Sequence, residues 1–426
     1  MSPEPLAHPT ADPTRPPAPL VESLPVAWPP ASDWWVMDAV GREAENGPVD
    51  GPGGVIGDML APTSAYLSKP AGVAMLPGGR LLVLDRGHGL LRVVEEGVLK
   101  IWAGRPDGTQ ARLDKPVPAR EVRLQGKTSP GEIATALDGT VWIVDGEASL
   151  LVIPPTSGRR YGLDLVAGSA HVVPLPVELG KVNGMSCAPD GSLVFTVTKI
   201  SNSSSTAHRY LYRLDTEGKV SVLAGSGAEG VLLPEDGVPF AEATISGPSS
   251  PFVDPAGNVW FSEVGKVAVP VADGGLTQID VARVMVACVA DMQAFGRTFV
   301  AGRVYPAVGA GPKTSYSARS DSKDAVDQGD GRPALLATVF KVSSISMLPE
   351  GHLVVTDPTL GRLRLLDRET GVIHRLAGPG GAIEPGDVPI ALARLALPTY
   401  LAADPAGIIW ISDFGANKVR RVGRIP

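Results

Sequence analysis

The stretch Leu395–Val422, LALPTYLAADPAGIIWISDFGANKVRRV, decides the fold of this chain. It contains a short apolar run, a DPAG turn at Asp404–Gly407, a second run at Ile408–Asp413 and, after a turn at Gly415, a third run, KVRRV. Short apolar runs bounded by Gly and Pro are typical of antiparallel strands. The stretch therefore predicts three strands of one unit, and the printed sequence ends soon after the third.

The same unit occurs upstream with a fourth strand. Residues 342–378, VSSISMLPEGHLVVTDPTLGRLRLLDRETGVIHRLAG, repeat the three runs and add VIHRLAG. Endings of this kind, Ala-Gly or Val-Gly after an apolar run, mark the outer strand of each predicted unit. Their glycines are Gly41, Gly104, Gly168, Gly225, Gly302 and Gly378.

First and second strands repeat in the same way. Each predicted first strand follows a turn rich in Pro, Ser and Gly, and a tight turn such as PGG, LDG, PDG, PAG or PEG joins it to the second strand. Gly tolerates the positive φ that tight antiparallel hairpins require. Third strands are clear at 90–94, 210–214, 362–366 and in the final KVRRV, and they are less clear in the second and fourth units.

Six such units in series predict an all-β fold, a six-bladed β-propeller of four-stranded antiparallel blades. In this ring each blade buries both faces against its neighbours, and closure removes exposed sheet edges. The last unit lacks an outer strand, whereas DWWVMDAVG at 33–41 has the form of an outer strand without a unit of its own. We therefore expect a strand at about 34–40 to complete the last blade and close the ring.

The composition agrees with many short strands, because 50 of the 426 residues are Gly, 41 are Pro and only 19% are charged. The net charge of −7 argues against a dedicated nucleic-acid binder, which needs a basic face. Cys187 and Cys288 lie in predicted strands, so two buried free thiols are expected rather than a disulfide framework. The sequence shows no secretory signal and no apolar run of membrane-spanning length, so we expect a cytoplasmic protein without a membrane partner.

Two kinds of segment depart from the repeat. Residues 1–32 are rich in Pro and predict a flexible or polyproline-like arm, which is either a plain linker or a ligand for an aromatic-lined groove. Residues 33–426 are expected to form a single propeller domain with loop insertions at 199–208 and 304–330. Long loops on a rigid scaffold often carry function, but insertions without a function also collect there.

The links between units resemble those of the NHL-repeat family. Units of that family run from an Ala-Gly ending through a Gly-Asp-Gly-rich loop into a Pro-Gly-Val strand and then an Ile-Ala-Asp strand. The counterparts here are GDGRPA at 329–334, PAGV at 70–73, and VLD at 83–85 or ISD at 411–413. The resemblance covers residues 34–422.

This resemblance implies a non-catalytic protein-binding or assembly module that presents a disc face and the two insertions to a protein partner. NHL propellers also serve as sensor domains and RNA binders, although no nucleic-acid partner is expected for this acidic chain. The alternative is a metal-dependent hydrolase or lyase, because the architecture also resembles the gluconolactonase and strictosidine-synthase groups. Its site would lie at the central channel, which is also where a small-molecule ligand would bind.

The central channel is where first strands converge, so the residues at their starts are the candidate site residues. They form a ring of Ala71, Glu132, Asn183, Ser250, Ser344 and Thr399. Asn183 resembles the metal-binding asparagine of the gluconolactonase group, and Glu132 is the one carboxylate, so these two are the candidate metal ligands. Calcium takes six to eight oxygens. No cofactor is therefore expected, with calcium or zinc at the channel mouth as the alternative, and no catalytic residue is assigned.

The remaining polar repeats have structural explanations. Carboxylates at the ends of second strands are expected to accept backbone N–H bonds in the following turn. They are Asp85, Asp145, Glu263, Asp357 and Asp413, while Val197 takes this place in the third unit. His88 is expected to be a solvated turn residue, and no histidine pair has zinc-ligand spacing.

Basic residues that could contact RNA are scattered over several units, so we expect them to be solvated at the surface. They are Arg159, Arg160, Arg209, Arg362, Arg364, Arg420 and Arg421.

Overall fold

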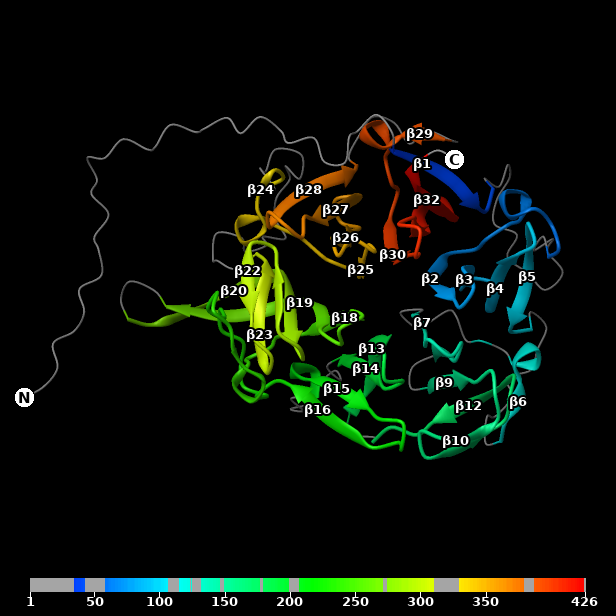
Figure 1. Cartoon of the computed structure of the whole chain (residues 1–426), viewed down its shortest axis with the longest axis horizontal. Coiled ribbons are helices and arrows are strands. Elements are labelled where there is room, and N and C mark those ends of the chain that lie inside the picture. Colours follow the sequence, from blue (N-terminus) through cyan, green and yellow to red (C-terminus); the bar gives the residue numbers. More distant parts are fainter. Residues whose placement is uncertain are drawn as a thin grey trace, which may run out of the picture.

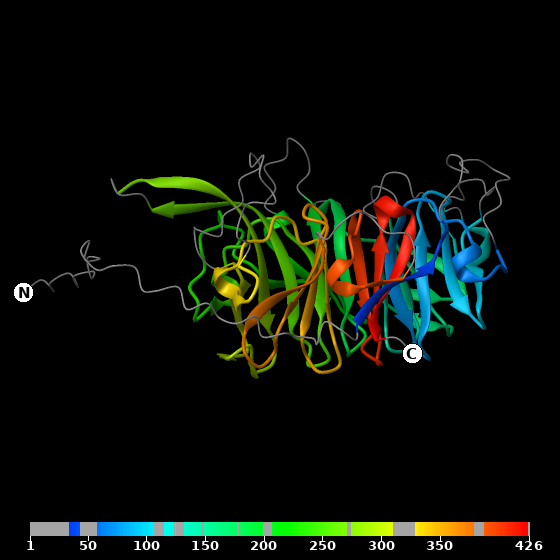
Figure 2. The same cartoon turned by 90° about the horizontal axis from the view of Figure 1, so that it is seen from above.

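The computed structural model describes residues 34–42, 58–105, 115–122, 124, 132–145, 149–176, 179–198, 207–270, 274–309, 329–378 and 387–424. Six antiparallel sheets of these residues surround a central axis and form the predicted six-bladed β-propeller, and two further two-stranded sheets are short hairpins (Figure 1). Seen from its edge in Figure 2, the molecule is a disc. Helical structure is confined, in the described residues, to short 3-10 turns, none of which is long enough to span a membrane.

Two blades have four strands in chain order from the axis outward. The first blade contains β2 (Pro70–Leu76), β3 (Arg80–Asp85), β4 (Leu90–Glu95) and β5 (Val98–Ala103). The third blade contains β13 (Lys181–Cys187), β14 (Leu193–Thr198), β15 (Leu211–Leu214) and β16 (Val220–Ala224). Both confirm the meander that the tight glycine turns predict.

The second and fourth blades carry a fifth, two-residue strand on the outside. The second contains β7 (Ile133–Thr135), β8 (Val141–Asp145), β9 (Ser149–Ile153), β12 (Ser169–Val173) and the outermost β6 (Val117–Pro118). The fourth contains β18 (Pro248–Val253), β19 (Val259–Pro270), β20 (Leu276–Cys288), β23 (Arg303–Val308) and β17 (Val238–Pro239).

In these two blades the predicted outer strands were wrong. The runs that end at Gly168 and Gly302 belong instead to extra hairpins between the third and fourth strands. The hairpins pair β10 (Gly158–Arg160) with β11 (Leu163–Leu165), and β21 (Met292–Ala294) with β22 (Arg297–Phe299). The true outer strands begin after each glycine, because β12 pairs with β9 and β23 pairs with β20.

This correction also moves the boundary of the predicted 304–330 insertion. Residues 304–308 are part of β23, which completes the fourth blade. Residues 310–328, which make up most of the predicted insertion, lie outside the described residues, as do 199–206 of the other insertion and the Pro-rich 1–32.

The last two blades follow the same plan. The fifth contains β25 (Ser344–Met347), β26 (Leu353–Asp357), β27 (Arg362–Leu366), β28 (Val372–Ala377) and β24 (Arg332–Pro333). The sixth contains β30 (Pro398–Ala403), β31 (Ile409–Asp413), β32 (Lys418–Arg424), then β1 (Trp34–Val40) and β29 (Val388–Pro389).

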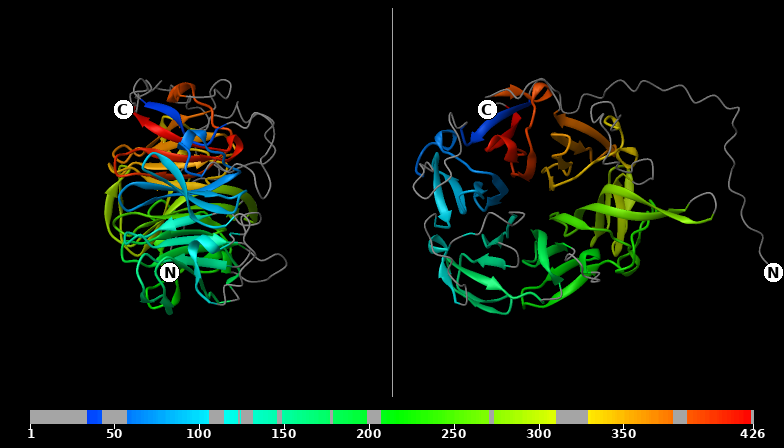
Figure 3. Two further views of the ribbon diagram at one scale, coloured as in Figure 1. Left: turned by 90° about the vertical axis from the view of Figure 1, so that its right-hand side faces the viewer. Right: turned by 180° about the vertical axis from the view of Figure 1, so that it is seen from behind.

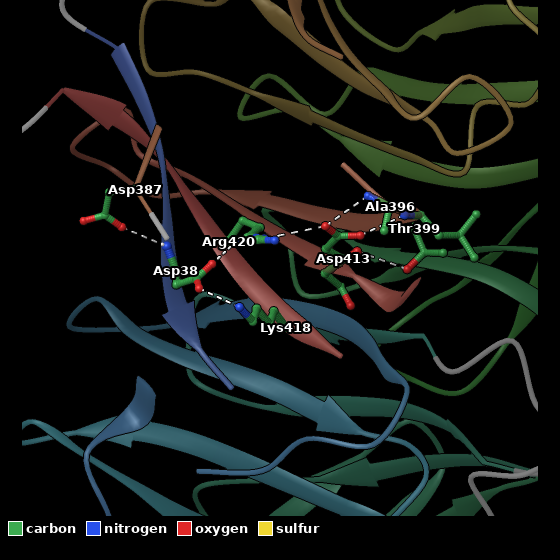
Figure 4. Close-up of polar contacts among 9 residues, drawn as sticks. Asp38, Asp387, Ala396, Thr399, Asp413, Lys418 and Arg420 are labelled. Carbon is green, nitrogen blue, oxygen red and sulfur yellow. Dashed lines mark hydrogen bonds and ion pairs between the residues drawn. The ribbon is translucent and has the colours of Figure 1, made fainter. Parts of the chain in front are cut away.

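The predicted closure by β1 is confirmed. β1 pairs antiparallel with β32 from Trp34 opposite Arg424 to Val40 opposite Val419. Trp34, Val36 and Val40 are buried. At the centre of the strand, Asp38 accepts hydrogen bonds from Lys418 Nζ at 2.7 Å and from Arg420 (Figure 4). The two ends of the described chain are therefore joined by both a ladder and an ion-pair cluster.

Four of the links between blades share a feature that the sequence analysis missed. A Val-Pro or Arg-Pro pair forms the outermost strand of the next blade, and a 3-10 turn follows at once. These turns are η2 (Ala119–Glu121), η5 (Phe240–Glu242), η7 (Ala334–Leu336) and η8 (Ile390–Leu392). Pro suits this position because an edge strand needs no further donor.

Candidate functional site

The first strands of the six blades surround a central channel that contains two cavities. The smaller has a volume of about 240 Å³ and the larger about 530 Å³. All six residues predicted at the starts of the first strands line one of the two. Glu132 and Ser344 line the smaller cavity, Ala71, Asn183 and Thr399 line the larger, and Ser250 lines both.

Hydroxyl groups tie neighbouring blades together beside the channel. At four of the six seams, a Ser or Thr hydroxyl exchanges a hydrogen bond with the backbone of the next blade. Examples are Thr135 Oγ1 to the Met75 carbonyl at 2.8 Å and Ser250 Oγ to the Ser343 carbonyl at 2.8 Å. The others include the Val253 N–H to Ser186 Oγ at 3.0 Å and the Leu401 N–H to Ser344 Oγ at 3.1 Å. These hydroxyls are structural.

A fifth seam, between the last and first blades, is tied from the second strand by Ser412 Oγ, which donates to the Pro70 carbonyl at 2.6 Å. The remaining seam joins the second and third blades, and there Glu132 takes the place of the hydroxyl. Its carboxyl accepts a hydrogen bond from the Met185 backbone N–H. The other oxygen, Oε2, is buried and has no hydrogen-bond partner among the described residues.

Burial gives the Glu132 carboxyl an unusual proton affinity. The residue is only 7% exposed, and burial raises its pKa to about 8, against an opposing effect of the Met185 N–H. Removal of a carboxylate from water penalises the charged form. At neutral pH, Glu132 therefore carries a proton and can donate one hydrogen bond and accept another.

Asn183 lies in a different setting from Glu132. Thr196 donates a hydrogen bond to Asn183 Oδ1 at 2.7 Å, within the third blade, and the side chain lines the larger cavity only. The two candidate metal ligands thus do not share a cavity. Within the described ranges, no group of three or more His, Cys, Asp or Glu side chains is arranged to hold a metal ion. Their role as metal ligands stays a prediction.

The repeated carboxylates act as predicted, on backbone N–H groups, but chiefly on a different segment. Asp85 Oδ1 accepts from the Ser68 N–H at 2.8 Å, and Asp413 Oδ1 accepts from the Leu397 N–H at 2.8 Å. Both donors belong to the loop that leads into the first strand of the same blade. Asp85 and Asp413 therefore each fix the start of a first strand at the channel.

Several of the arginines predicted to be solvated are instead buried. Arg362, Arg364 and Arg420 are at most 7% exposed. Arg364 Nε donates to Asp330 at 2.8 Å, and Arg420 lies between Asp38 and Asp413 (Figure 4). The partners of Arg364 lie in the loop that leads into its own blade, and those of Arg420 lie on neighbouring strands of its own blade, so both arginines are paired inside the fold rather than solvated. Arg159 is exposed, while Arg160, Arg209 and Arg421 are half-buried.

His88 is also not the solvated turn residue that was predicted. Its side chain is 8% exposed, and Nδ1 lies 2.8 Å from Asp85 Oδ2. The Asp85 carboxylate therefore holds the start of the first strand through Oδ1 and this turn through Oδ2.

The two cysteines are free, as predicted. Cys288 is buried, and Cys187 is half-buried beside the smaller cavity. Burial raises the pKa of the Cys187 thiol, so it stays protonated near neutral pH.

One feature lies outside the disc. The ribbon formed by β19 and β20 is about twice as long as the corresponding strands of the other blades, and its distal half projects beyond them (Figures 1 and 3). We call residues 264–270 and 276–282 the arm. One face is stabilised by Val267, Val269 and Val281, which cluster with Leu232.

The opposite face of the arm is open. Cross-strand pairs place Val264, Lys266 and Pro270 on that face with Asp280 and Leu276. Leu276 is 71% exposed and Val264 is 37% exposed. The run NVWFSE, at 258–263, predicts a second strand here, but its extension to Pro270 was not predicted.

Comparison with known proteins supports the fold. No family model matches the chain, and no curated protein matches it. Similar solved structures include an auxiliary nutrient binding protein from Bacteroides ovatus, with 14% identity, a TM-score of 0.55 and coverage of 92% of this chain and 77% of that chain. A protein of unknown function from Bacteroides thetaiotaomicron has 14% identity, a TM-score of 0.53 and coverage of 92% and 76%. This chain is a six-bladed β-propeller, and these likenesses concern the fold alone.

Proposed function

We propose that this propeller is a non-catalytic protein-binding or assembly module of the NHL-like type, and that the arm is the part that contacts the partner protein. The observation that supports the proposal is the arm itself. The other five blades form complete sheets with second strands of five or six residues, so the fold does not require the extension. Cytoplasmic residence remains a prediction from the sequence.

The arm is held in a fixed position. A two-stranded ribbon is marginally stable by itself in water. Here the Ala268 N–H donates to the Gly230 carbonyl at 2.8 Å, and Val231 forms a parallel bridge with Ala268. The loop around Gly230 therefore supports the ribbon. A preorganised ribbon loses little conformational entropy when a partner binds.

The arm also offers a strand edge. In the described residues, β20 pairs with β23 only from Val284 onward, so 276–283 pair with β19 alone. An unpaired edge is a template for an added strand, whose main chain supplies affinity while side-chain contacts supply specificity. Exposed Leu276 and Val264 lie on the open face next to this edge and give apolar contacts for the partner.

The test removes the arm and leaves the blade intact. Lys266–Asp280 is replaced by Asn-Gly, which joins Gly265 to Val281, a cross-strand pair in the native register. Asn-Gly favours the type I′ turn of a two-residue hairpin. We expect the variant to fold, with a Tm within a few degrees of that of the full chain. We also expect the variant to lose the protein contact that the full chain makes. This contact is measured either as self-association in sedimentation experiments or as a protein that copurifies with the full chain from its source.

A matched control changes an exposed apolar residue elsewhere. Leu137, in the turn between β7 and β8, is 79% exposed. Leu137→Ser is expected to keep the partner. If Leu137→Ser loses the partner and the arm deletion retains it, the contact surface is the blade turns and the role of the arm is wrong.

The alternative, a metal-dependent hydrolase or lyase, makes a different prediction. The chain offers Glu132 in one cavity and Asn183 in the other, and a hard cation needs several converging oxygens. We expect elemental analysis of the dialysed protein to give less than one calcium, zinc, manganese or iron per chain. One tightly bound metal that is lost in Glu132→Ala or Asn183→Ala would favour the enzyme and justify screening of lactones and esters.

A further inference from the structure

The Glu132 carboxyl has one more oxygen than the connection between the second and third blades needs. Four seams are tied by a Ser or Thr hydroxyl of a first strand, and Ser412 ties a fifth. A hydroxyl at position 132 would provide the same kind of tie with a smaller side chain. The carboxyl adds a second oxygen, Oε2, which is buried without a hydrogen-bond partner among the described residues, and Glu132 lines the smaller cavity. Buried polar atoms are nearly always paired, so an unpaired one indicates a missing partner.

The surroundings of Glu132 define the chemistry of that partner. Among the described residues, the lining of the smaller cavity contains no Lys, Arg, His or second carboxylate. Its other polar side chains include seam hydroxyls, such as those of Thr135 and Ser344, which are already bonded to the backbone. Apolar groups such as Met75 and Phe252 make up much of the remainder. The surface of this cavity is more polar than apolar, and its described side chains carry no cation, so it suits a small, uncharged molecule with polar groups.

We propose that the smaller cavity binds a small neutral ligand with a hydrogen-bond donor next to an acceptor, as in a carboxamide or lactam, and that protonated Glu132 recognises this edge through a pair of hydrogen bonds. The Glu132 O–H donates to the ligand carbonyl. The ligand N–H donates to the other Glu132 oxygen.

A charged ligand fits less well. An ammonium group would require the carboxyl to ionise in a cavity whose described lining has no other charged side chain, and both charges would lose much of their hydration. A carboxylate ligand would place a second anionic group beside Glu132. A neutral amide enters without a change in protonation, and both of its polar atoms are paired after binding.

Titration of Glu132 provides a clear signature. In the part of the chain that the structure describes, the other titratable groups that line this cavity are Tyr400, on β30, and Cys187, on β13. Burial raises the pKa of both, so both stay protonated while Glu132 loses its proton near pH 8. Arg86, which lines the larger cavity, acts on Tyr400. Loss of binding between pH 6 and pH 9 therefore reports Glu132.

The experiment uses three probes with the same five-membered ring and the full-length protein. They are 2-pyrrolidinone (donor and acceptor), cyclopentanone (acceptor only) and pyrrolidine (a cation at pH 6). Binding is measured by saturation-transfer NMR and titration calorimetry at pH 6 and pH 9. We expect 2-pyrrolidinone to bind best at pH 6 and roughly tenfold more weakly at pH 9, because about one carboxyl in ten remains protonated one pH unit above its pKa.

Two variants separate recognition from shape. Glu132→Gln keeps a donor and an acceptor, so it should bind 2-pyrrolidinone within about threefold of wild type and equally at both pH values. Glu132→Leu keeps similar bulk and should lose binding. Glu350→Gln, the same chemical change at an exposed turn residue outside the channel, is expected to bind normally. Thermal unfolding of each variant shows that it is folded.

Three results would overturn the proposal. One is that pyrrolidine binds better than 2-pyrrolidinone and that Glu132→Gln abolishes the binding of pyrrolidine, which identifies a cation site. Another is calcium binding that depends on Glu132. The third is that folded wild-type protein binds none of the three probes at pH 6. Failure of the arm deletion to affect a partner would leave this site untouched, so the two proposals fail independently.

Discussion

Removal of residues 1–41 is expected to abolish cooperative folding or to lower the Tm by well over 10 °C, whereas removal of residues 1–32 shifts it by no more than about 2 °C. The longer deletion takes away β1, which buries Trp34, Val36 and Val40 in the last blade. Each such side chain contributes about 1.5–3 kcal/mol through burial. The loss exposes the core between the fifth and sixth blades and reopens the edge of β32.

Electrostatics adds to the effect of this deletion. Lys418 and Arg420 have side chains that are 4% and 3% exposed, and both pair with Asp38 (Figure 4). Breaking a buried ion pair costs up to about 3–5 kcal/mol, and Asp413, 3.6 Å from Arg420, retains part of the pairing here. Together with the lost burial, this uses up most of the ~5–15 kcal/mol by which a domain is normally stable.

Thermal unfolding monitored by circular dichroism and calorimetry measures both truncations. Two further samples identify the cause. Asp38→Asn in the full chain removes only the charge and should cost about 3 kcal/mol. A peptide with residues 33–42, added to the longer truncation, should restore part of the lost Tm by pairing with β32. Equal and small effects of both truncations would show that closure by β1 contributes little to stability.

The ring and its closure could be predicted because their signals are local and repeated. A tight glycine turn fixes each hairpin, and a unit without an outer strand at one end matches a spare strand at the other. The ring positions, from Ala71 to Thr399, followed from the same register, and all of them line the channel. Such features need no knowledge of which residues meet across the fold.

The wrong predictions concern segments whose local sequence is similar but whose contacts in the fold differ. The Val-Ala-Gly at 166–168 resembles the end of an outer strand, but β11 pairs with β10 rather than with the blade. Arg420 belongs to the basic run KVRRV and was predicted to be solvated, yet it lies between Asp38 and Asp413. Pairing across the sheet decides both cases, and a single strand carries no record of it.

The same limit applies to the candidate site. The sequence identified Glu132 as the one carboxylate of the ring. The unpaired Oε2 and the absence of a cation from the cavity lining depend on how five other first strands pack around it. A lone Glu in a sequence has no such context, so the proton that it holds could not be predicted.

Replacement of Glu132 by Gln is expected to increase the free energy of unfolding at pH 7 by about 3 kcal/mol. The ordinary pKa of the carboxyl is 4.5, and the folded protein raises it to about 8. Between these values the folded state binds a proton that the unfolded state has released. Stability therefore falls as the pH rises through this window, by about 1.4 kcal/mol per pH unit, and becomes independent of Glu132 again above about pH 8.

Gln removes this dependence because it does not titrate, and its amide oxygen can still accept the hydrogen bond from the Met185 N–H. Urea unfolding of both proteins at pH 5, 6, 7 and 8 should therefore show a difference that is small at pH 5 and largest at pH 8. Exposed Glu350→Gln, in the turn before β26, applies the same chemical change outside the channel and is the matched control. A Glu132→Gln protein that is less stable than wild type at pH 8, or equally stable at every pH, would contradict the buried and protonated state.

A gain in stability would also bear on function. If Gln stabilises the fold, then Glu132 costs the empty protein free energy at neutral pH, although a hydroxyl ties the adjacent seams without such a cost. Residues that destabilise a fold are typical of binding and catalytic sites, where a ligand later compensates for the strain or the unpaired group. Addition of 2-pyrrolidinone should then stabilise the wild-type protein at pH 6 more than at pH 9, which connects the stability of the folded ring to the occupancy of its channel.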